Sequence, residues 1–386
     1  MLLTRGFPLA PHHCPRPLAA ATRVYRTQTG AREMLKSMPA REMRIARARA
    51  NVRLRSLGLT NTFVSDDTDV HHQFVGAMRE LIKAPTDWIL FRDIATLAIR
   101  DVLHGAESEP FDFFVGQVTL QMICSGLLQS PPTPGIDYWV HLRAAVRAIT
   151  QLWLASKTAE PIHLQITTSS TLHNDLRALL PDTARFPNPI DFIIPTYETM
   201  WRVVATLIAY TCHDPDYCNI LYDLYEQPTS EQFVHRGIRT GKPRVSARDI
   251  VHETLRVHPP TKRIGRVMAD SSGFISRTLG LTRDVLHRAD IEAAQRANVW
   301  GEEPGIWRPE RFIQGEGGAH TSAHLLAFGY GPGACIAREW APMAAGLIAA
   351  AILYTFDDPS GQYNIVKGPR VGDRQGWEGW EVTKVV

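Results

Sequence analysis

The sequence predicts a mainly α-helical protein with a smaller β region. Most of the first 212 residues repeat apolar side chains at a spacing close to 3.6 residues, which is typical of helices. The second half has fewer such segments, more glycine and proline, and short β-like runs. A length of 386 residues with 44% hydrophobic residues allows a sizeable core in one large domain or two medium ones.

The periodic segments predict a series of helices in the first half of the chain. The expected ranges are 31–56 (basic and amphipathic), 66–84, 88–103, 113–128, 138–156, 173–180 and 190–212. Asn188 and Pro189 favour the start of the last helix, because a capping side chain precedes a ring fixed at helical φ. That helix is apolar nearly all round, so we expect it to be buried in the middle of the domain.

The N-terminal region has a different composition. The first 32 residues contain five arginines and two histidines, with no acid before Glu33. We therefore expect residues 1–50 to form a basic arm, disordered or targeting, ahead of a catalytic domain at 51–386. A mitochondrial presequence is the targeting alternative.

Charge and cysteine content narrow the class of protein. A formal net charge of +3 is nearly balanced and does not indicate a nucleic-acid-binding face. The five cysteines are odd in number and lack a framework-like spacing, which favours a reducing intracellular setting. The longest charge-free stretch, 113–136, carries three glutamines and three prolines, so no transmembrane span is expected.

The segment from Leu325 to Phe356 carries the strongest chemical signal. Its glycines and Pro332 predict a tight loop in which the backbone approaches a large flat ligand. We expect a helix to start just after Cys335 and to run to about Tyr354, where backbone N–H groups at its start would stabilise a thiolate. A small buried cysteine beside a glycine-rich turn is the alternative.

Within this segment, FGYGPGACIA resembles the cytochrome P450 signature F-x-x-G-x-R-x-C-x-[GA]. Phe328, Gly331, Cys335 and Ala337 match, and Gly333 stands where the family has arginine. The resemblance implies a cytochrome P450 fold with part of the N-terminal sheet missing, and haem bound through the Cys335 thiolate. It also implies that Phe328, Gly331 and Ala337 are cofactor-binding residues.

The missing arginine normally contacts a haem propionate, so another residue is expected to do so. Arg266 lies thirteen residues after Glu253, on the strand that in the family passes beside the haem. We expect Arg266 to make this contact, with Arg263 as the second choice. An ordinary exposed arginine is the alternative for either.

A second match is an E-x-x-R pair, Glu253 and Arg256, one helical turn apart and followed by two prolines. The later sequence WRPERF resembles the P-E-R-F element of the family. By this resemblance Glu253, Arg256 and Arg311 form a buried charge network that holds the haem-loop region. Taken alone, such a pair is usually a solvated surface ion pair.

A third match is PTYET at 195–199, similar to the family's A-G-x-[DE]-T on its oxygen-binding helix. Glu198 and Thr199 are the predicted catalytic residues, with Thr199 bonding to dioxygen and Glu198 relaying protons. Pro195 is expected to kink the helix and open a local groove. A kink with a capping-type hydroxyl is the alternative. Trp139 and Arg143 form a W-x-x-x-R pattern that we interpret as coincidence, with Trp139 in the core.

The resemblance implies a monooxygenase that takes electrons from NADPH through NADPH–cytochrome P450 reductase and oxidises a lipophilic small molecule. The altered motifs are similar to those of a divergent fungal branch, which suggests secondary metabolism. Family membership implies the endoplasmic reticulum membrane, with peripheral contact, and the basic arm implies mitochondria as the alternative. Two other hypotheses stay open: a haem-thiolate rearranging or dehydrating enzyme without external electrons, and a degenerate non-catalytic relative.

Overall fold

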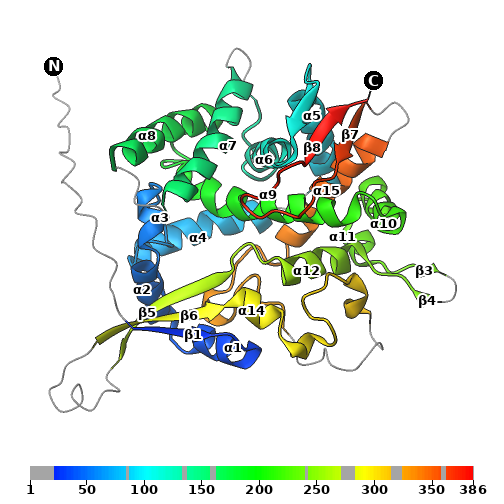
Figure 1. The fold of residues 1–386 in the computed structure, drawn as a ribbon. Coiled ribbons are helices and arrows are strands. Elements are labelled where there is room, and N and C mark those ends of the chain that lie inside the picture. Colours follow the sequence, from blue (N-terminus) through cyan, green and yellow to red (C-terminus); the bar gives the residue numbers. More distant parts are fainter. Residues whose placement is uncertain are drawn as a thin grey trace, which may run out of the picture.

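Helices dominate the computed structural model, which describes residues 21–83, 87–132, 137–156, 162–239, 242–270, 283–313, 324–357 and 362–385. The helices are α1 (Gln28–Lys36), α2 (Ala40–Ala50), α3 (Val52–Ser56), α4 (Thr68–Lys83), α5 (Trp88–Leu103), α6 (Phe111–Met122), α7 (Tyr138–Ala155), α8 (Ile162–Leu179), α9 (Ile190–Thr211), α10 (Pro215–Glu226), α11 (Ser230–Val234), α12 (Ala247–Val257), α14 (Ile291–Gln295) and α15 (Ala341–Asp357). In Figure 1, α9 crosses the middle of the molecule between α5–α8 and a small sheet. The predicted fold class is confirmed.

The strands form three small sheets. The largest has the order β1 (Thr22–Tyr25), β6 (Arg283–Asp290), β5 (Arg263–Asp270), with β1 parallel and β5 antiparallel to β6. A second sheet has the order β2 (Ser108–Pro110), β8 (Glu381–Lys384), β7 (Tyr363–Val366), and β3 (Ile238–Arg239) pairs with β4 (Lys242–Pro243). The second sheet brings the C-terminal segment against the start of α6, since Phe111 donates to the Trp380 carbonyl.

The core lies around α9 and α15. Both helices are mainly apolar and almost entirely buried, and they pack on each other. Helix α9 also packs against α6 and α12, and α15 also packs against α5, α10 and α12. Each fully buried leucine or isoleucine here contributes roughly 1.5–3 kcal/mol relative to an exposed one. The helix predicted at 190–212 therefore lies in the middle of the domain.

A proline inside α9 is compensated from outside the helix. Pro195 has no N–H, so the carbonyl of Asp191 loses its helical partner. The Asn61 side chain donates to that carbonyl over 2.9 Å, and the Asp191 carboxylate accepts bonds from the backbone and hydroxyl of Thr60. The loop before α4 is thereby fixed to the start of α9.

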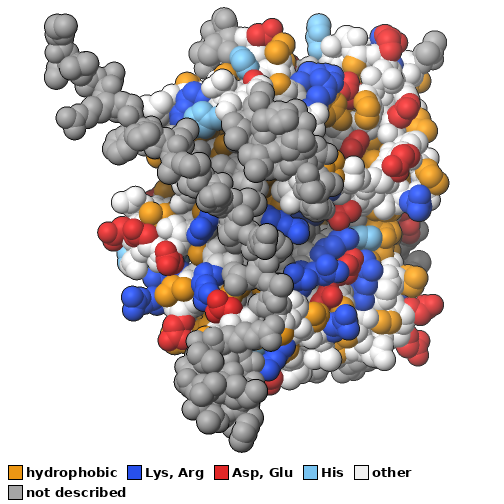
Figure 2. Space-filling view, turned by 60° about the vertical axis from the view of Figure 1, so that its left-hand side comes forward, with side chains coloured by type: hydrophobic (Ala, Val, Ile, Leu, Met, Phe, Trp, Pro, Cys, Tyr) orange, Lys and Arg blue, Asp and Glu red, His pale blue; other side chains and the backbone are white. Residues whose placement is uncertain are grey.

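The N-terminal region differs from the prediction. The helix expected at 31–56 is divided into α1, α2 and α3, with Pro39 at the first break. The boundary expected at residue 50 does not coincide with a break in the fold, because β1 pairs with β6 and α1 and α2 pack on the same sheet. Residues 1–20 of the predicted basic arm lie outside the described residues. Figure 2 turns the side of α2 and α3 toward the viewer and shows Lys and Arg side chains gathered across this face.

Two other helix predictions were wrong in extent. The helix expected at 173–180 is the last part of α8, whose polar TTSST run hid the pattern. The helix expected just after Cys335 begins only at Ala341, and residues 336–340 form turns. Among the described residues, no helix combines the length and apolar character needed to cross a membrane.

Candidate functional site

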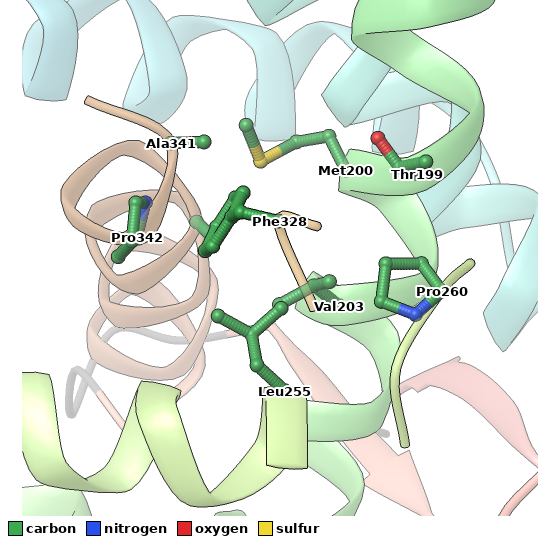
Figure 3. Close-up of a pocket in the computed structure, with 9 residues that line it drawn as sticks. Thr199, Met200, Val203, Leu255, Pro260, Phe328, Ala341 and Pro342 are labelled. Atoms are coloured by element: carbon green, nitrogen blue, oxygen red, sulfur yellow. The ribbon is translucent and has the colours of Figure 1, made fainter. Parts of the chain in front are cut away.

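Helix α9 and the segment around Cys335 meet at a small cavity of about 40 Å³. Thr199, Met200 and Val203 line it from α9, and Phe328 lines it from the segment before the cysteine. Figure 3 shows Phe328 between these α9 side chains and Pro342 at the start of α15. The lining is apolar except for the Thr199 hydroxyl, so a polar reactant here would depend on that hydroxyl.

Cys335 is joined through its backbone to this cavity lining. Its backbone N–H donates to the Phe328 carbonyl over 2.8 Å, which links the cysteine to the cavity wall. Cys335 is exposed, yet the protein packed around its sulfur raises the pKa of the thiol, and a bond from the Ala337 backbone N–H partly offsets this. No helix begins at Cys335, so the predicted stabilisation of a thiolate by a helix N-terminus is absent. The Ala337 backbone N–H is the amide that bonds to the sulfur instead. A metal ion bound to the sulfur would hold it as a thiolate.

Glycine is required in the loop before the cysteine. Gly331 has φ +68°, and a Cβ there would lie 3.1 Å from the Lys36 Cα of α1. Gly329 also has a positive φ, of +72°. The loop can therefore turn and lie against α1 only with glycine at these positions.

Gly333 leaves space for an arginine from another element. A Cβ on Gly333 would lie 2.9 Å from Nη2 of Arg266 and 3.1 Å from the sulfur of Met43. Arg266 comes from β5 and is only 3% exposed. Its guanidinium therefore lies beside the residue that replaces the family's arginine, as its predicted role requires.

Arg266 belongs to a group of three arginines, together with Arg44 and Arg47 of α2; Arg44 and Arg266 are buried and Arg47 is half-buried. Burial, and then the charges of Arg266 and Arg44, lower the pKa of Arg47 to about 10. Burial likewise lowers the pKa of Arg266 to about 10. The Nε atoms of Arg44 and Arg47 are buried without a partner.

No carboxylate among the described residues pairs with these three arginines. Arg44 donates to the Thr68 hydroxyl, Arg47 to Thr62, and Arg266 to the Gly265 carbonyl. Buried cations without a counter-ion are costly, so this arrangement is suited to an anionic ligand group beside the Cys335 loop. Arg263, the second choice, points away: its side chain is 61% exposed and lies 3.9 Å from Asp290.

Glu198 and Thr199 do not face the same cavity. Successive helical residues point about 100° apart, and Glu198 faces the C-terminal segment, where Arg374 donates to its carboxylate over 2.6 Å. Burial raises the pKa of Glu198, and the charges of Arg374 and Arg202 partly offset this. Glu198 thereby joins α9 to the C-terminal segment, and its role as a proton relay for Thr199 stays a prediction.

Glu253, Arg256 and Arg311 lie together and are fully buried. Arg256 donates to both carboxylate oxygens of Glu253 over 2.6 and 2.8 Å, and Nε of Arg311 donates over 3.2 Å. Terminal nitrogens of the same two guanidinium groups also donate to the backbone carbonyls of residues 295, 300, 302–304 and 306. This network ties α12 to the segment that precedes the Cys335 loop.

Sequence reasoning missed Arg44 and Arg47. Their spacing of three residues places them on one face of α2, on the side of the buried Met43. An arginine pair on an otherwise apolar face was the available signal, but the prediction placed this stretch in a basic arm, disordered or targeting. Arg143 of the W-x-x-x-R pattern pairs with Glu109, 3.0 Å away, and the half-buried Trp139 packs against the main core.

Residues 247–359 match the family model described as Cytochrome P450. A relative from Panax ginseng, "Cytochrome P450 CYP749A22", is 28% identical over 109 residues, which are 28% of this chain and 21% of that protein. "Cytochrome P450 monooxygenase claQ" of Ampulloclitocybe clavipes is 27% identical over 156 residues, or 36% and 29%. The chain thus spans less than a third of the length of these relatives.

Solved cytochrome P450 structures resemble the chain over nearly its whole length. A zebra fish cytochrome P450 with progesterone has a TM-score of 0.63 at 15% identity and covers 94% of this chain and 93% of its own. A 6-coordinated cytochrome P450 from Thermus thermophilus has a TM-score of 0.61, also at 15% identity, with 94% and 92% covered. At these identities the likeness concerns the fold.

Proposed function

We propose that this chain, which belongs to the cytochrome P450 family, is a haem-thiolate monooxygenase with Cys335 as the protein ligand of the iron. One observation carries the proposal: Arg266 lies against Gly333 of the Cys335 loop and belongs, with Arg44 and Arg47, to a group of arginines without a counter-ion among the described residues. Haem carries two propionates, which are the anions that such a group would bind. The sulfur of Cys335 also fits, since thiolate is the iron ligand used by this class of haem enzyme.

The fit is one of charge and ligand type. A cavity of about 40 Å³ has room for only a few waters. A tetrapyrrole is much larger, so haem binding requires the Cys335 loop and α9 to lie further apart than in this structure.

Haem bound at Cys335 would supply the activation of dioxygen. Arg44, Arg47 and Arg266 would hold its carboxylates, and the Ala337 amide would stabilise negative charge on the sulfur. Thr199, the polar residue of the cavity lining, would donate or relay a hydrogen bond to the reactant. Met200, Val203 and Phe328 would exclude bulk water from it.

The proposal extends to the electron source, the substrate class and the cellular location. Electrons would come from NADPH through NADPH–cytochrome P450 reductase, and the substrate would be lipophilic because the cavity lining is apolar. The similarity to the monooxygenase claQ supports a role in fungal secondary metabolism. Peripheral contact with the endoplasmic reticulum membrane is proposed by family resemblance, with a mitochondrial location as the alternative.

A haem titration of the full chain tests the arginine assignment. Arg266→Gln should weaken haem binding by about tenfold, because one charge-assisted bond contributes roughly 1.5–3 kcal/mol. Arg263→Gln, on the same strand but exposed, is the matched control and should bind haem like the parent. Equal losses in both variants, or none in Arg266→Gln, would contradict the assignment.

One observation favours a second candidate, a rearranging or dehydrating haem-thiolate enzyme. The acid and the hydroxyl of the PTYET segment face different sides of α9, which favours chemistry that needs no direct proton transfer between them. The two functions differ in their need for reductant. Product formation that requires NADPH, a reductase and dioxygen supports the monooxygenase, and turnover without them supports the second candidate.

A further inference from the structure

A second and larger cavity lies on the opposite side of α9. It measures about 220 Å³ and lies between the start of α6, the middle of α7 and α9. Tyr197 and Trp201 line it from α9, whereas Thr199 and Val203 face the first cavity. Positions two apart on a helix point in nearly opposite directions, so one helix separates the two cavities.

One wall of this cavity carries a carboxylate without a counter-ion. Asp112, in the first turn of α6, is half-buried and has no basic partner among the described residues. Burial raises the pKa of this carboxyl, and bonds from its own and the Phe113 backbone N–H partly offset this. The nearby charge of Glu378 raises it further. A cation bound in the cavity would relieve this unfavourable environment.

The α7 side of the cavity carries a guanidinium, that of the exposed Arg147, without an acidic partner among the described residues. Arg147 of α7 lies over the Phe113 ring, 4.6 Å from its centroid. Arg143, one turn earlier, also lies over Phe113 but is paired with Glu109. Arg147 therefore keeps its hydrogen-bonding capacity for a ligand, and no ion pair joins it to Asp112.

The rest of the lining suits a flat apolar ring that carries polar groups. Phe113, Tyr197 and Trp201 supply aromatic surface, and Thr150 and Gln151 supply hydrogen-bonding groups at the α7 side. Aromatic rings attract both other rings and organic cations. A volume of about 220 Å³ is below the roughly 300–1,000 Å³ of pockets for drug-sized ligands, so the occupant is small.

We propose that this cavity binds a small aromatic zwitterion, with its ammonium at Asp112, its carboxylate at Arg147 and its ring among Phe113, Tyr197 and Trp201. An aromatic amino acid has this chemistry. The two unlike charges line one cavity from different helices, and the ammonium and carboxylate of such a ligand would supply each with an opposite charge. The site is separate from the Cys335 region and does not depend on haem.

Calorimetric titration of the full chain tests this with three matched probes: L-phenylalanine, 2-phenylethylamine, which has only the ammonium, and 3-phenylpropionate, which has only the carboxylate. L-Phenylalanine should bind one molecule per chain and more tightly than either other probe. Asp112→Asn should weaken L-phenylalanine and 2-phenylethylamine by about tenfold and leave 3-phenylpropionate unchanged. Arg147→Gln should weaken L-phenylalanine and 3-phenylpropionate and leave 2-phenylethylamine unchanged.

Arg100→Gln and Asp101→Asn, on the exposed surface of α5, are the control variants and should bind all probes like the parent. Thermal unfolding of each variant checks that it folds. No saturable heat with L-phenylalanine would overturn the proposal, and so would binding that neither cavity variant changes. In haem-loaded protein, a shift of the haem absorption on adding L-phenylalanine would place it at the Cys335 side and would also overturn it.

Discussion

At the scale of single residues, the Cys335 loop depends on what glycine permits. Gly331 combines a positive φ with close contact to the backbone of α1, and Gly333 leaves space for the Arg266 guanidinium. The sequence motif predicted a tight loop and a replacement arginine, and Gly333 and Arg266 do lie side by side. Motif spacing could not show Arg44 and Arg47, because their proximity arises from the packing of α2 on β5.

Replacing Gly331 by alanine should lower the free energy of unfolding by about 1–3 kcal/mol, because an L side chain strains at φ +68° and its Cβ meets Lys36. Chemical denaturation measures this. Gly105→Ala is a control for φ alone, since Gly105 has φ +73° and open space around its Cβ position. Gly305→Ala, with open space and no positive φ, controls for the added methyl group. A Gly331→Ala cost no larger than that of Gly105→Ala would contradict the role of the α1 contact.

At the scale of elements, α9 shows how one helix is matched to its surroundings. Pro195 removes a helical bond, and Asn61 restores a partner for the Asp191 carbonyl from a loop about 130 residues earlier. The apolar periodicity was sufficient to predict α5 and α9 to within one residue. It failed at α8 and at the start of α15, where polar runs and a turn segment interrupt the pattern.

Asn61→Ala should therefore destabilise the protein by about 1–3 kcal/mol, because it leaves the buried Asp191 carbonyl without a partner. The loss should be smaller when Pro195→Ala is already present, since the new N–H at position 195 can bond to that carbonyl. Urea denaturation of the four proteins of this cycle gives the coupling. Asn188→Ala, which removes bonds to Gly58 and Thr60 in the same loop, is the control and should be independent of Pro195→Ala. A coupling of zero between Asn61 and Pro195 would show that Asn61 does not compensate for the proline.

At the scale of the whole molecule, buried ionisable groups link the helical core to the sheet region. Glu253, Arg256 and Arg311 do so through ion pairs. Two histidines, His252 and His258, lie on or next to the same helix, α12. Burial, followed by neighbouring cations, lowers the pKa of both His252 and His258 to about 4. Nε2 of His258 lies 2.8 Å from the Tyr210 hydroxyl, an arrangement that neutral histidine can accept.

These histidines should make the fold sensitive to mild acid. Their pKa is lower in the folded chain than the value of about 6.5 expected in the unfolded chain, so the unfolded chain binds protons first as the pH falls. Stability should therefore decline from about pH 6.5 to about pH 4, with no further loss from these groups below that. Thermal unfolding across this range should show a shallower decline for His252→Gln/His258→Gln. His104→Gln, at an exposed position, should leave the slope unchanged, and a parental slope in the double variant would refute the assignment.

The fold class could be predicted from the sequence, but the contacts between residues far apart in the chain could not. Three motifs in order implied the family's fold, and the structure places Thr199, Phe328 and Cys335 in one region. The pairing of β1 with β6 joins residues more than 260 positions apart, and the Glu198–Arg374 pair joins residues 176 apart. No local pattern encodes such contacts, because they depend on how the elements pack.

The most direct test of the central claim is the absorption spectrum of the reduced, haem-loaded chain with carbon monoxide. If Cys335 supplies a thiolate to the iron, the complex should show the long-wavelength Soret band typical of thiolate ligation, and Cys335→Ser should abolish that band. The exposed surface of Cys335 is available for such ligation. A parent chain without this band, or a Cys335→Ser variant that retains it, would contradict the account.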